Sequence, residues 1–501
     1  MISSSPALQG VSAEAIGSFI AAVEAANLDL HTFVLARRGA VVARVSWDPF
    51  QLDAPHMLFS LSKSFTSTAV GLAIAERLLA LDDRVIDHFP DDLPAKIDDN
   101  LAAMRVRHLL SMSTGHTSEA MSAALGGGER WARVFLAQSV PMPPGSFFLY
   151  NTLATYMAGA IVQRATGLTL VDYLTPRLFA PLKIEIPRWE TDPQGYNVGG
   201  WGLMLGVEDI AKFGQLYLQD GVWREKRILP EGWVAQATAK QVENGDNPEN
   251  DWNHGYGFQF WRCKVPGVYR GDGAFGQFCI VMSEQEAVVA ITAGTADLQG
   301  VMNAVWTHIA PGLNASSDGA AAGAEPLVLR REMSAVAGVP STPRGAAVSG
   351  KTIRFDPEPA LRADFGGTAS ARVSTPRAAS RVRSDVPALA PREAFSSARF
   401  EFKPDGSAVA IFNDDDRHPL HVAYGRWLPR GESGLPGEQV LASARGAWTS
   451  DDTYAFRVIY LRTPFAHDFT LRIAGQTATL TWRENLAFGE REERTITGQI
   501  S

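Results

Sequence analysis

Apolar residues recur at helical spacing near the start of the chain and alternate with polar residues shortly afterwards. Residues 12–28 place apolar side chains every three to four positions, and Ser12 has the side chain of a helix N-cap. Residues 31–39 and 40–46 then have the pattern of two strands joined by a tight turn at Arg38 and Gly39. The chain is therefore predicted to open with a helix and a β-hairpin.

A second helix is predicted to begin near Ser60, and it has an unusual composition. From Ser64 to Ala75 it contains no charged residue, so it must be buried on nearly every side. The stretch from about Leu81 to Asp251 is mostly helical, with helices that stop at Gly167 and Gly221.

Strand patterns return after this helical block, at residues 256–261, 267–273, 276–283 and 287–294, and a helix at 296–310 follows. One antiparallel sheet collects the first and last strands, with helices on its faces and the helical block inserted as a lobe. This is an α+β architecture for residues 1–312.

The remaining residues predict a second domain. Residues 313–345 are predicted to be a linker, flexible over 313–325 and with a short helix at 326–337. Residues 346–501 form this domain. It includes a long loop at 366–391 that is rich in Ala, Ser, Arg and Pro, and from Phe395 onward the pattern is almost entirely β. We expect an antiparallel barrel or sandwich there.

Composition excludes several classes of function. The 501 residues carry a net charge of −8 without a basic footprint, so nucleic acid is not expected as a partner. No apolar run reaches the roughly 20 residues that span a bilayer. The N-terminal MISSSPALQG lacks the pattern of a secretory signal, so we expect a cytoplasmic location and no membrane partner.

Cofactor and thiol chemistry are not predicted either. The ten histidines show no paired metal-ligand spacing, so neither a metal nor another cofactor is expected. The two cysteines, Cys263 and Cys279, are interpreted as reduced, buried thiols on neighbouring strands.

The candidate chemistry lies at the start of the uncharged helix. FSLSKSFTS supplies Ser60 and Lys63, the one S-x-x-K in the chain. Residues three apart share a helix face, so the Lys63 amine can reach the Ser60 hydroxyl. Burial and the positive helix N-terminus both lower the pKa of the lysine, and a neutral lysine can activate the serine as a nucleophile.

The segment resembles the active-site helix of class C β-lactamases, penicillin-binding proteins and their esterase and D-aminopeptidase relatives. Residues 108–118, 144–167 and 199–214 are similar to segments of the same family, and the resemblance covers about residues 10–312. It implies a β-lactamase-like domain. The C-terminal domain resembles the lipocalin-like or barrel extensions of some of these hydrolases.

The family's Tyr-x-Asn element is matched by Tyr150, Asn151 and Thr152. The resemblance implies that Tyr150 is the general base or proton shuttle beside Ser60 and Lys63. Thr152 stands where Asn is usual, and its hydroxyl has fewer donor hydrogens than an amide. Asn151 is the alternative substrate-binding residue if the loop is shifted by one position.

The family's Lys-Thr-Gly or His-x-Gly element is matched by Gly271, Asp272 and Gly273, without the basic residue. The resemblance implies that Gly273 lets substrate lie against the strand and that the amides of Ser60 and Ala274 form the oxyanion hole. If Asp272 faces the pocket, it repels a substrate carboxylate and favours neutral or amine-bearing substrates, unless Arg270 neutralises it.

These features predict a serine hydrolase that acts through an acyl-enzyme on a small-molecule ester or amide, with esters preferred over β-lactams. D-Aminopeptidase, amidase and β-lactamase activities are the alternatives among hydrolases. A sensor that is acylated without turnover and an acyltransferase are the alternatives of other classes. Whether the chain forms a homo-oligomer is left open.

Overall fold

The computed structural model describes residues 1–126, 128–313, 325–356, 395–428, 431–432 and 441–501. They fall into two compact units: Met1–Val45 with Leu52–Leu329, and Ser46–Gln51 with the described residues from Arg330 onward. The predicted loop at 366–391 and residues 314–324 of the predicted linker lie outside the described residues. No helix in the described ranges is long and apolar enough to cross a membrane.

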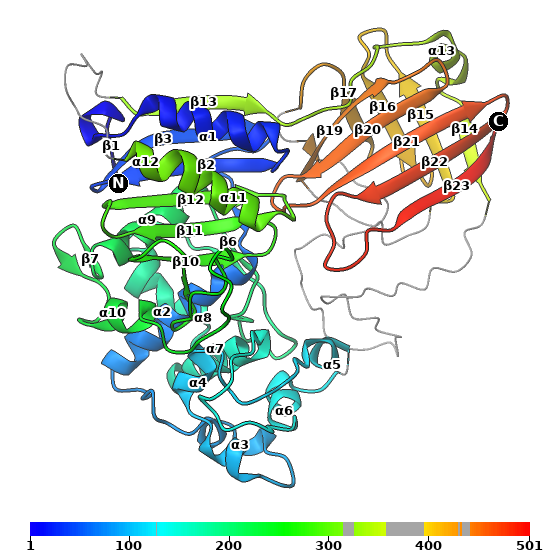
Figure 1. Cartoon of the computed structure of the whole chain (residues 1–501). Helices are drawn as coiled ribbons and strands as arrows, with labels where there is room; N and C mark the ends of the chain where they lie inside the picture. Colours follow the sequence, from blue (N-terminus) through cyan, green and yellow to red (C-terminus); the bar gives the residue numbers. More distant parts are fainter. Residues whose placement is uncertain (127, 314–324, 357–394, 429–430, 433–440) are drawn as a thin grey trace. The chain divides into compact units, whose positions relative to one another are not determined.

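An eight-stranded sheet forms the framework of the first unit. Its strands follow the order β1-β3-β2-β12-β11-β10-β9, and β13 also pairs with β3. The strands are β1 (Ile2–Ser3), β2 (Leu30–Arg37), β3 (Ala40–Asp48), β9 (Trp261–Arg262), β10 (Val268–Gly273), β11 (Gln277–Met282), β12 (Ala287–Ala293) and β13 (Leu327–Glu332). The N-terminal hairpin thus lies beside strands from more than 200 residues later, as the α+β prediction requires (Figure 1).

Helices cover both faces of this sheet, so its central strands are buried on both sides. Every residue of β2, β11 and β12 is buried. Helix α9 (Val207–Leu218) packs against these three strands. On the opposite face lie α1 (Ala13–Ala25), α11 (Leu298–Ala304), the π-helical η6 (Val305–Ile309) and α12 (Ala310–Gly312) (Figure 1).

The inserted lobe surrounds helix α2 (Ser62–Ala75), in which every residue from Ser62 to Ala73 is buried. Helix α2 packs most extensively against α7 (Thr152–Thr166). The other α-helices of this block are α3 (Asp99–Ala103), α4 (Val106–Leu110), α5 (Met121–Gly126), α6 (Trp131–Leu136), α8 (Leu170–Leu174) and α10 (Trp233–Thr238). Short turns of helix are η1 (Ala7–Gln9), η2 (Phe59–Leu61), η3 (Val85–His88), η4 (Pro90–Asp92) and η5 (Thr175–Phe179).

Two small sheets complete the first unit. Strands β4 (His56–Met57), β6 (Leu203–Leu205) and β5 (Arg188–Trp189) form one, and β7 (Val222–Trp223) and β8 (Lys226–Arg227) form the other. Strand β4 ends just before the turn that holds Ser60, so the first of these sheets helps to fix where α2 begins.

The buried hydroxyls of α2 explain how a polar helix can be enclosed. The Ser62 hydroxyl accepts a hydrogen bond from the Leu203 amide, while Ser64 donates to the Gln259 carbonyl and Thr66 to the Gly199 carbonyl. Buried polar groups need such partners, because an unmade hydrogen bond costs about 1–3 kcal/mol. The same bonds clamp three surrounding segments onto the helix that carries Lys63.

Local signals in the first unit were largely predictive, with one exception. Ser12 caps α1 by accepting a hydrogen bond from the Ala15 amide, and Gly167 ends α7 in the left-handed conformation. In the predicted strand 256–261, however, only Trp261 belongs to β9. Gln259 has φ +66° and its amide donates to the Leu110 carbonyl, so the segment bends into the lobe.

The second unit contains a closed antiparallel barrel, which confirms the predicted fold class. Its strand order is β17-β16-β15-β14-β23-β22-β21-β20-β19, closed by a parallel β17–β19 pairing, with β18 added beside β19. The strands are β14 (Thr352–Phe355), β15 (Ser397–Phe402), β16 (Ala408–Phe412), β17 (Leu420–Ala423), β18 (Gly431–Glu432), β19 (Leu441–Trp448), β20 (Thr453–Tyr460), β21 (Ala466–Ala474), β22 (Thr477–Glu484) and β23 (Glu493–Ile500).

Aromatic side chains pack together among the buried residues of this unit. Phe456 and Phe469 stack with their ring centroids 4.7 Å apart, and Phe412 and Trp482 each lie within 5.0 Å of the Phe395 ring. All five are buried. Side chains thus pack this core, as in other small barrels.

The helix predicted within the linker was wrong. Residues 326–337 do not form a helix, because Leu327–Glu332 is strand β13. Unpaired groups along the edge of β3 make a strand the stable state of this segment. A short helix does occur later, where Thr342 caps α13 (Pro343–Val348).

Candidate active site

Ser60 lies in the turn that leads into α2. It is the middle residue of η2, and Phe59 before it has φ +47°, a left-handed conformation that a bulky residue rarely adopts. The Phe59 ring meets the Phe275 ring edge-on at 5.5 Å. The side chain of Ser60 is half-buried, whereas Leu61 and the helix that follows are enclosed. Only the first two residues of the turn, Phe59 and Ser60, are thus partly exposed.

Lys63 lies one helical turn further on and points back at the serine. Its Nζ is 2.9 Å from the Ser60 Oγ, 2.7 Å from the Gly200 carbonyl oxygen and 3.4 Å from the Thr152 Oγ1. The side chain is only 1% exposed. Burial lowers the pKa of Lys63 to about 7, against the opposing charges of Glu119 and Asp272. A large part of the population is therefore neutral at physiological pH.

Tyr150 also lies next to Ser60. Its hydroxyl is hydrogen-bonded to Ser60, and the Lys63 Nζ lies 5.1 Å from the centre of its ring. The ring stacks on Trp261, with centroids 5.3 Å apart and planes 20° from parallel. Burial, reinforced by the nearby charge of Asp272, raises the pKa of Tyr150 far above its usual range. The phenol therefore keeps its proton at rest.

The two residues after Tyr150 have different environments. Asn151 is the N-cap of α7, where its Oδ1 accepts from the Ala154 amide, and its side chain is fully buried. Thr152 follows it, and its hydroxyl accepts from Lys63. Of the two alternatives, Thr152 is therefore the residue that contacts the lysine, while Asn151 holds the helix end.

Glu119 is a residue near the site that the sequence did not single out. Its Oε1 accepts a hydrogen bond from the Thr152 amide at 2.6 Å, and its charge acts on both Lys63 and Tyr150. It lies in the loop between α4 and α5, within the sequence that follows HLLSMSTGHTS. No local pattern distinguishes it from other exposed acidic residues.

Strand β10 presses its glycines against the start of α2. A Cβ on Gly273 would lie 2.0 Å from the Leu58 carbonyl oxygen, and one on Gly271 would lie 2.5 Å from the Ser64 Oγ and 2.6 Å from the Leu61 Cδ1. The missing side chains thus let the strand approach the Ser60 turn. Close packing by itself requires glycine at these two positions. The following residue, Ala274, is half-buried beside this turn.

Asp272 and Arg270 alternate with those glycines along the strand, so they point to the opposite face. Arg270 Nε lies 2.9 Å from Asp272 Oδ2, and both side chains are buried. Burial raises the pKa of Asp272, although the Arg270 charge opposes that shift. Arg270 therefore neutralises Asp272, which is one of the two arrangements that the sequence allows.

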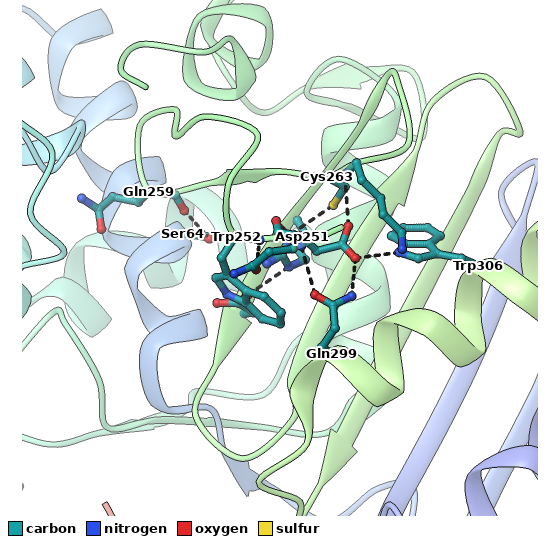
Figure 2. Close-up of polar contacts among 11 residues, drawn as sticks. Ser64, Asp251, Trp252, Gln259, Cys263, Gln299 and Trp306 are labelled. Atoms are coloured by element: carbon teal, nitrogen blue, oxygen red, sulfur yellow. Dashed lines mark hydrogen bonds and ion pairs between the residues drawn. The ribbon is translucent and has the colours of Figure 1, made fainter. Parts of the chain in front are cut away.

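Further contacts hold the arginine, and Figure 2 shows the residues Asp251, Trp252 and Cys263 that make them. Arg270 Nη1 donates to the Asp251 carbonyl and to the Cys263 sulfur, and its guanidinium lies 4.4 Å from the Trp252 ring centre. The Asp251 carboxylate in turn accepts from Gln299, at 2.7 Å, and from the Trp306 indole. The loop around Asp251 is thus tied to both β10 and the helices α11 and η6.

The two cysteines are buried free thiols, as interpreted from the sequence, but they do not lie on neighbouring strands. Cys279 is in β11, whereas Cys263 follows β9, and β10 lies between those strands. Within the described ranges, no cluster of three His, Cys, Asp or Glu side chains could hold a metal ion.

The family model described as Beta-lactamase matches residues 29–312, more than half of the chain. The chain belongs to the Beta-lactamase family. This confirms the resemblance inferred from the S-x-x-K helix and its neighbouring segments.

Similar proteins in this family include hydrolases. A 6-aminohexanoate-dimer hydrolase from Paenarthrobacter ureafaciens is 27% identical over 222 residues, which are 41% of this chain and 56% of that protein. This alignment thus spans little more than half of the hydrolase. Penicillin-binding protein 4 from Amycolatopsis lactamdurans is 26% identical over 288 residues, 50% of this chain and 72% of that protein.

A solved structure from Bacteroides dorei, provisionally described as a beta-lactamase, shares the fold. It matches with a TM-score of 0.51 and 17% identity, covering 60% of this chain and 99% of that one.

Proposed function

We propose that this protein is a serine hydrolase that cleaves a small-molecule ester or amide through an acyl-enzyme on Ser60. The observation that carries the proposal is the 2.9 Å contact between Ser60 Oγ and the buried amine of Lys63. A lysine enclosed in this way, with a pKa of about 7, can accept the hydroxyl proton as the serine attacks a carbonyl.

In the proposed acylation, the proton of Ser60 passes to neutral Lys63 while Oγ forms a bond to the substrate carbonyl carbon. Tyr150, protonated at rest because its pKa is raised, gives its phenolic proton to the departing alcohol or amine. The amides of Ser60 and Ala274 are assigned to the oxyanion. The close approach of Gly273 to the Ser60 turn supports that assignment, because it brings the two chain segments together.

Deacylation reverses the roles. The Tyr150 phenolate takes a proton from the attacking water, and the Lys63 ammonium returns its proton to Oγ as the acid leaves. Each proton is then back where it began, and the product is a carboxylic acid.

Esters are proposed as better substrates than β-lactams. The position that carries a basic residue in penicillin-recognising relatives is Gly271, and the space beside it is filled by Leu61 and Ser64. Arg270, the nearest arginine along β10, already forms a salt bridge with Asp272. A substrate carboxylate therefore lacks a cationic partner there.

Labelling and turnover test the proposal together. A fluorophosphonate probe followed by peptide mass spectrometry is expected to modify Ser60, and Ser60→Ala is expected to abolish both labelling and hydrolysis of p-nitrophenyl esters while remaining folded. Labelling of another residue, or full turnover by Ser60→Ala, would refute the scheme. Stable acylation by a true acyl substrate without release would favour the sensor alternative, and fast nitrocefin turnover with inert esters would favour a β-lactamase.

A further inference from the structure

An exposed carboxylate whose charge acts on Lys63 is not used by the mechanism. Glu119 is exposed, and its Oε1 accepts from the amide of Thr152, whose hydroxyl accepts from Lys63. Glu119 is therefore connected to the lysine through a single residue. The short hydrogen bond from the first amide of α7 fixes the position of the Glu119 carboxylate.

The carboxylate retains capacity to bind a ligand. A carboxylate offers about four lone-pair sites, and the bond to Thr152 occupies one of them. Among the described residues Glu119 has no cationic partner, unlike Glu76, which is paired with Arg177. A substrate cation can therefore reach it without displacing a salt bridge.

The two carboxylates near the nucleophile differ in how far their charge is balanced. The charged groups that act on Lys63 are Glu119 and Asp272, both acidic. Asp272 is buried and balanced by Arg270, so it presents little net charge to a ligand. Glu119 is then the uncompensated charge, and it repels carboxylates while attracting ammonium groups.

We propose that Glu119 binds an ammonium group of the substrate, so that the preferred substrates are amine-bearing esters or amides. This inference rests on the proposed serine hydrolase function and names its substrate class. It also replaces Asp272, which the sequence suggested for this role, because the Asp272 carboxylate is enclosed and already paired. The name of the Paenarthrobacter relative, a hydrolase of a 6-aminohexanoate dimer, is compatible with an amine-bearing substrate.

Matched pairs of compounds test the ammonium site. Two fluorophosphonates are compared for their rate of labelling Ser60, one with a chain ending in an ammonium and one in which a methyl replaces it. The same comparison is made for hydrolysis of the p-nitroanilides of 6-aminohexanoic and heptanoic acids. The quantity measured is the ratio of ammonium to methyl rates, in which any displacement of Thr152 cancels because it affects both compounds.

The wild-type protein is expected to favour the ammonium probe by about tenfold, the effect of roughly 1.4 kcal/mol of charge interaction. Glu119→Gln should bring the ratio to within about twofold of one, and Glu119→Lys should invert it. Glu231→Gln removes an exposed acidic charge just before α10 and should leave the ratio as in the wild type.

An unchanged ratio in Glu119→Gln, or a wild-type preference for the methyl compounds, would overturn the ammonium site while leaving the hydrolase proposal intact. Labelling without hydrolysis would contradict the hydrolase function, yet the labelling ratio would still decide the role of Glu119. If neither probe labels Ser60, both proposals fall.

Discussion

The carbonyl oxygen of Gly200 accepts a hydrogen bond from Lys63 Nζ at 2.7 Å. This bond holds the lysine toward a loop 137 residues away and keeps its amine beside Ser60. A Cβ on Gly200 would lie 2.7 Å from the Thr152 Cγ2. The loop can therefore come this close to Thr152 only because Gly200 has no side chain. The amine is thus positioned by a helix, a loop and the start of α7 together.

The first prediction concerns the pH dependence of turnover. Below its pKa of about 7, Lys63 holds a proton and cannot accept another, so kcat/KM should rise with pH through a single ionisation near pH 7. The measurement uses an ester without a titratable group between pH 5 and 9. A flat profile would exclude Lys63 as the base.

Lys63→Arg provides the matched variant. A guanidinium stays charged throughout this pH range, so it keeps the positive charge but cannot act as a base. We expect kcat/KM to fall by about 10²–10⁴-fold above pH 8, where the wild-type lysine is neutral, and to lose the dependence on an ionisation near pH 7. Lys63→Arg with the same pH profile as the wild type would show that the limb belongs to another group.

Tyr150→Phe is predicted to slow deacylation more than labelling. The ring and its stacking on Trp261 are preserved, but the oxygen that takes a proton from water is lost. An acyl-enzyme should therefore accumulate, visible by intact-protein mass spectrometry during hydrolysis of a p-nitrophenyl ester. Equal slowing of acylation and deacylation without accumulation would argue against the proposed role in water activation.

Gly271→Ala is predicted to destabilise the first unit by about 1–3 kcal/mol, because the added methyl meets Ser64 and Leu61 in a packed region. Gly17→Ala is the matched control. Gly17 lies inside α1 with nothing within 4 Å of the added Cβ, so the same change should stabilise by about 0.5–1 kcal/mol. Chemical denaturation measures both, and a stabilising Gly271→Ala would contradict the packing described for β10.

Removing one member of the Arg270–Asp272 pair is predicted to cost about 3–5 kcal/mol, because the remaining charge is left buried without its partner. The double variant Arg270→Met with Asp272→Leu should lose less than the sum of the single variants. A double-mutant cycle by urea denaturation measures this coupling. Strict additivity would mean that the two side chains stabilise the fold independently.

Several features of the fold were predictable because they depend on neighbours along the chain. Ser12 and Gly167 mark the limits of their helices through local backbone conformation, and the pattern from Phe395 onward indicated the β-strands of the second domain. The segment 326–337 was misinterpreted because its choice between helix and strand depends on the edge of β3, a partner almost 300 residues earlier.

For the site, the sequence alone indicated that Lys63 lies within reach of Ser60 at the start of a buried helix, since three-residue spacing and the absence of charge are local properties. Only the tertiary structure decided that Tyr150 meets Ser60, that Arg270 neutralises Asp272, and that Glu119 reaches the amide of Thr152. Those relationships join distant segments, and their geometry depends on the path of the whole chain. No local periodicity encodes that path, whereas a single helical turn is enough to bring a lysine to a serine.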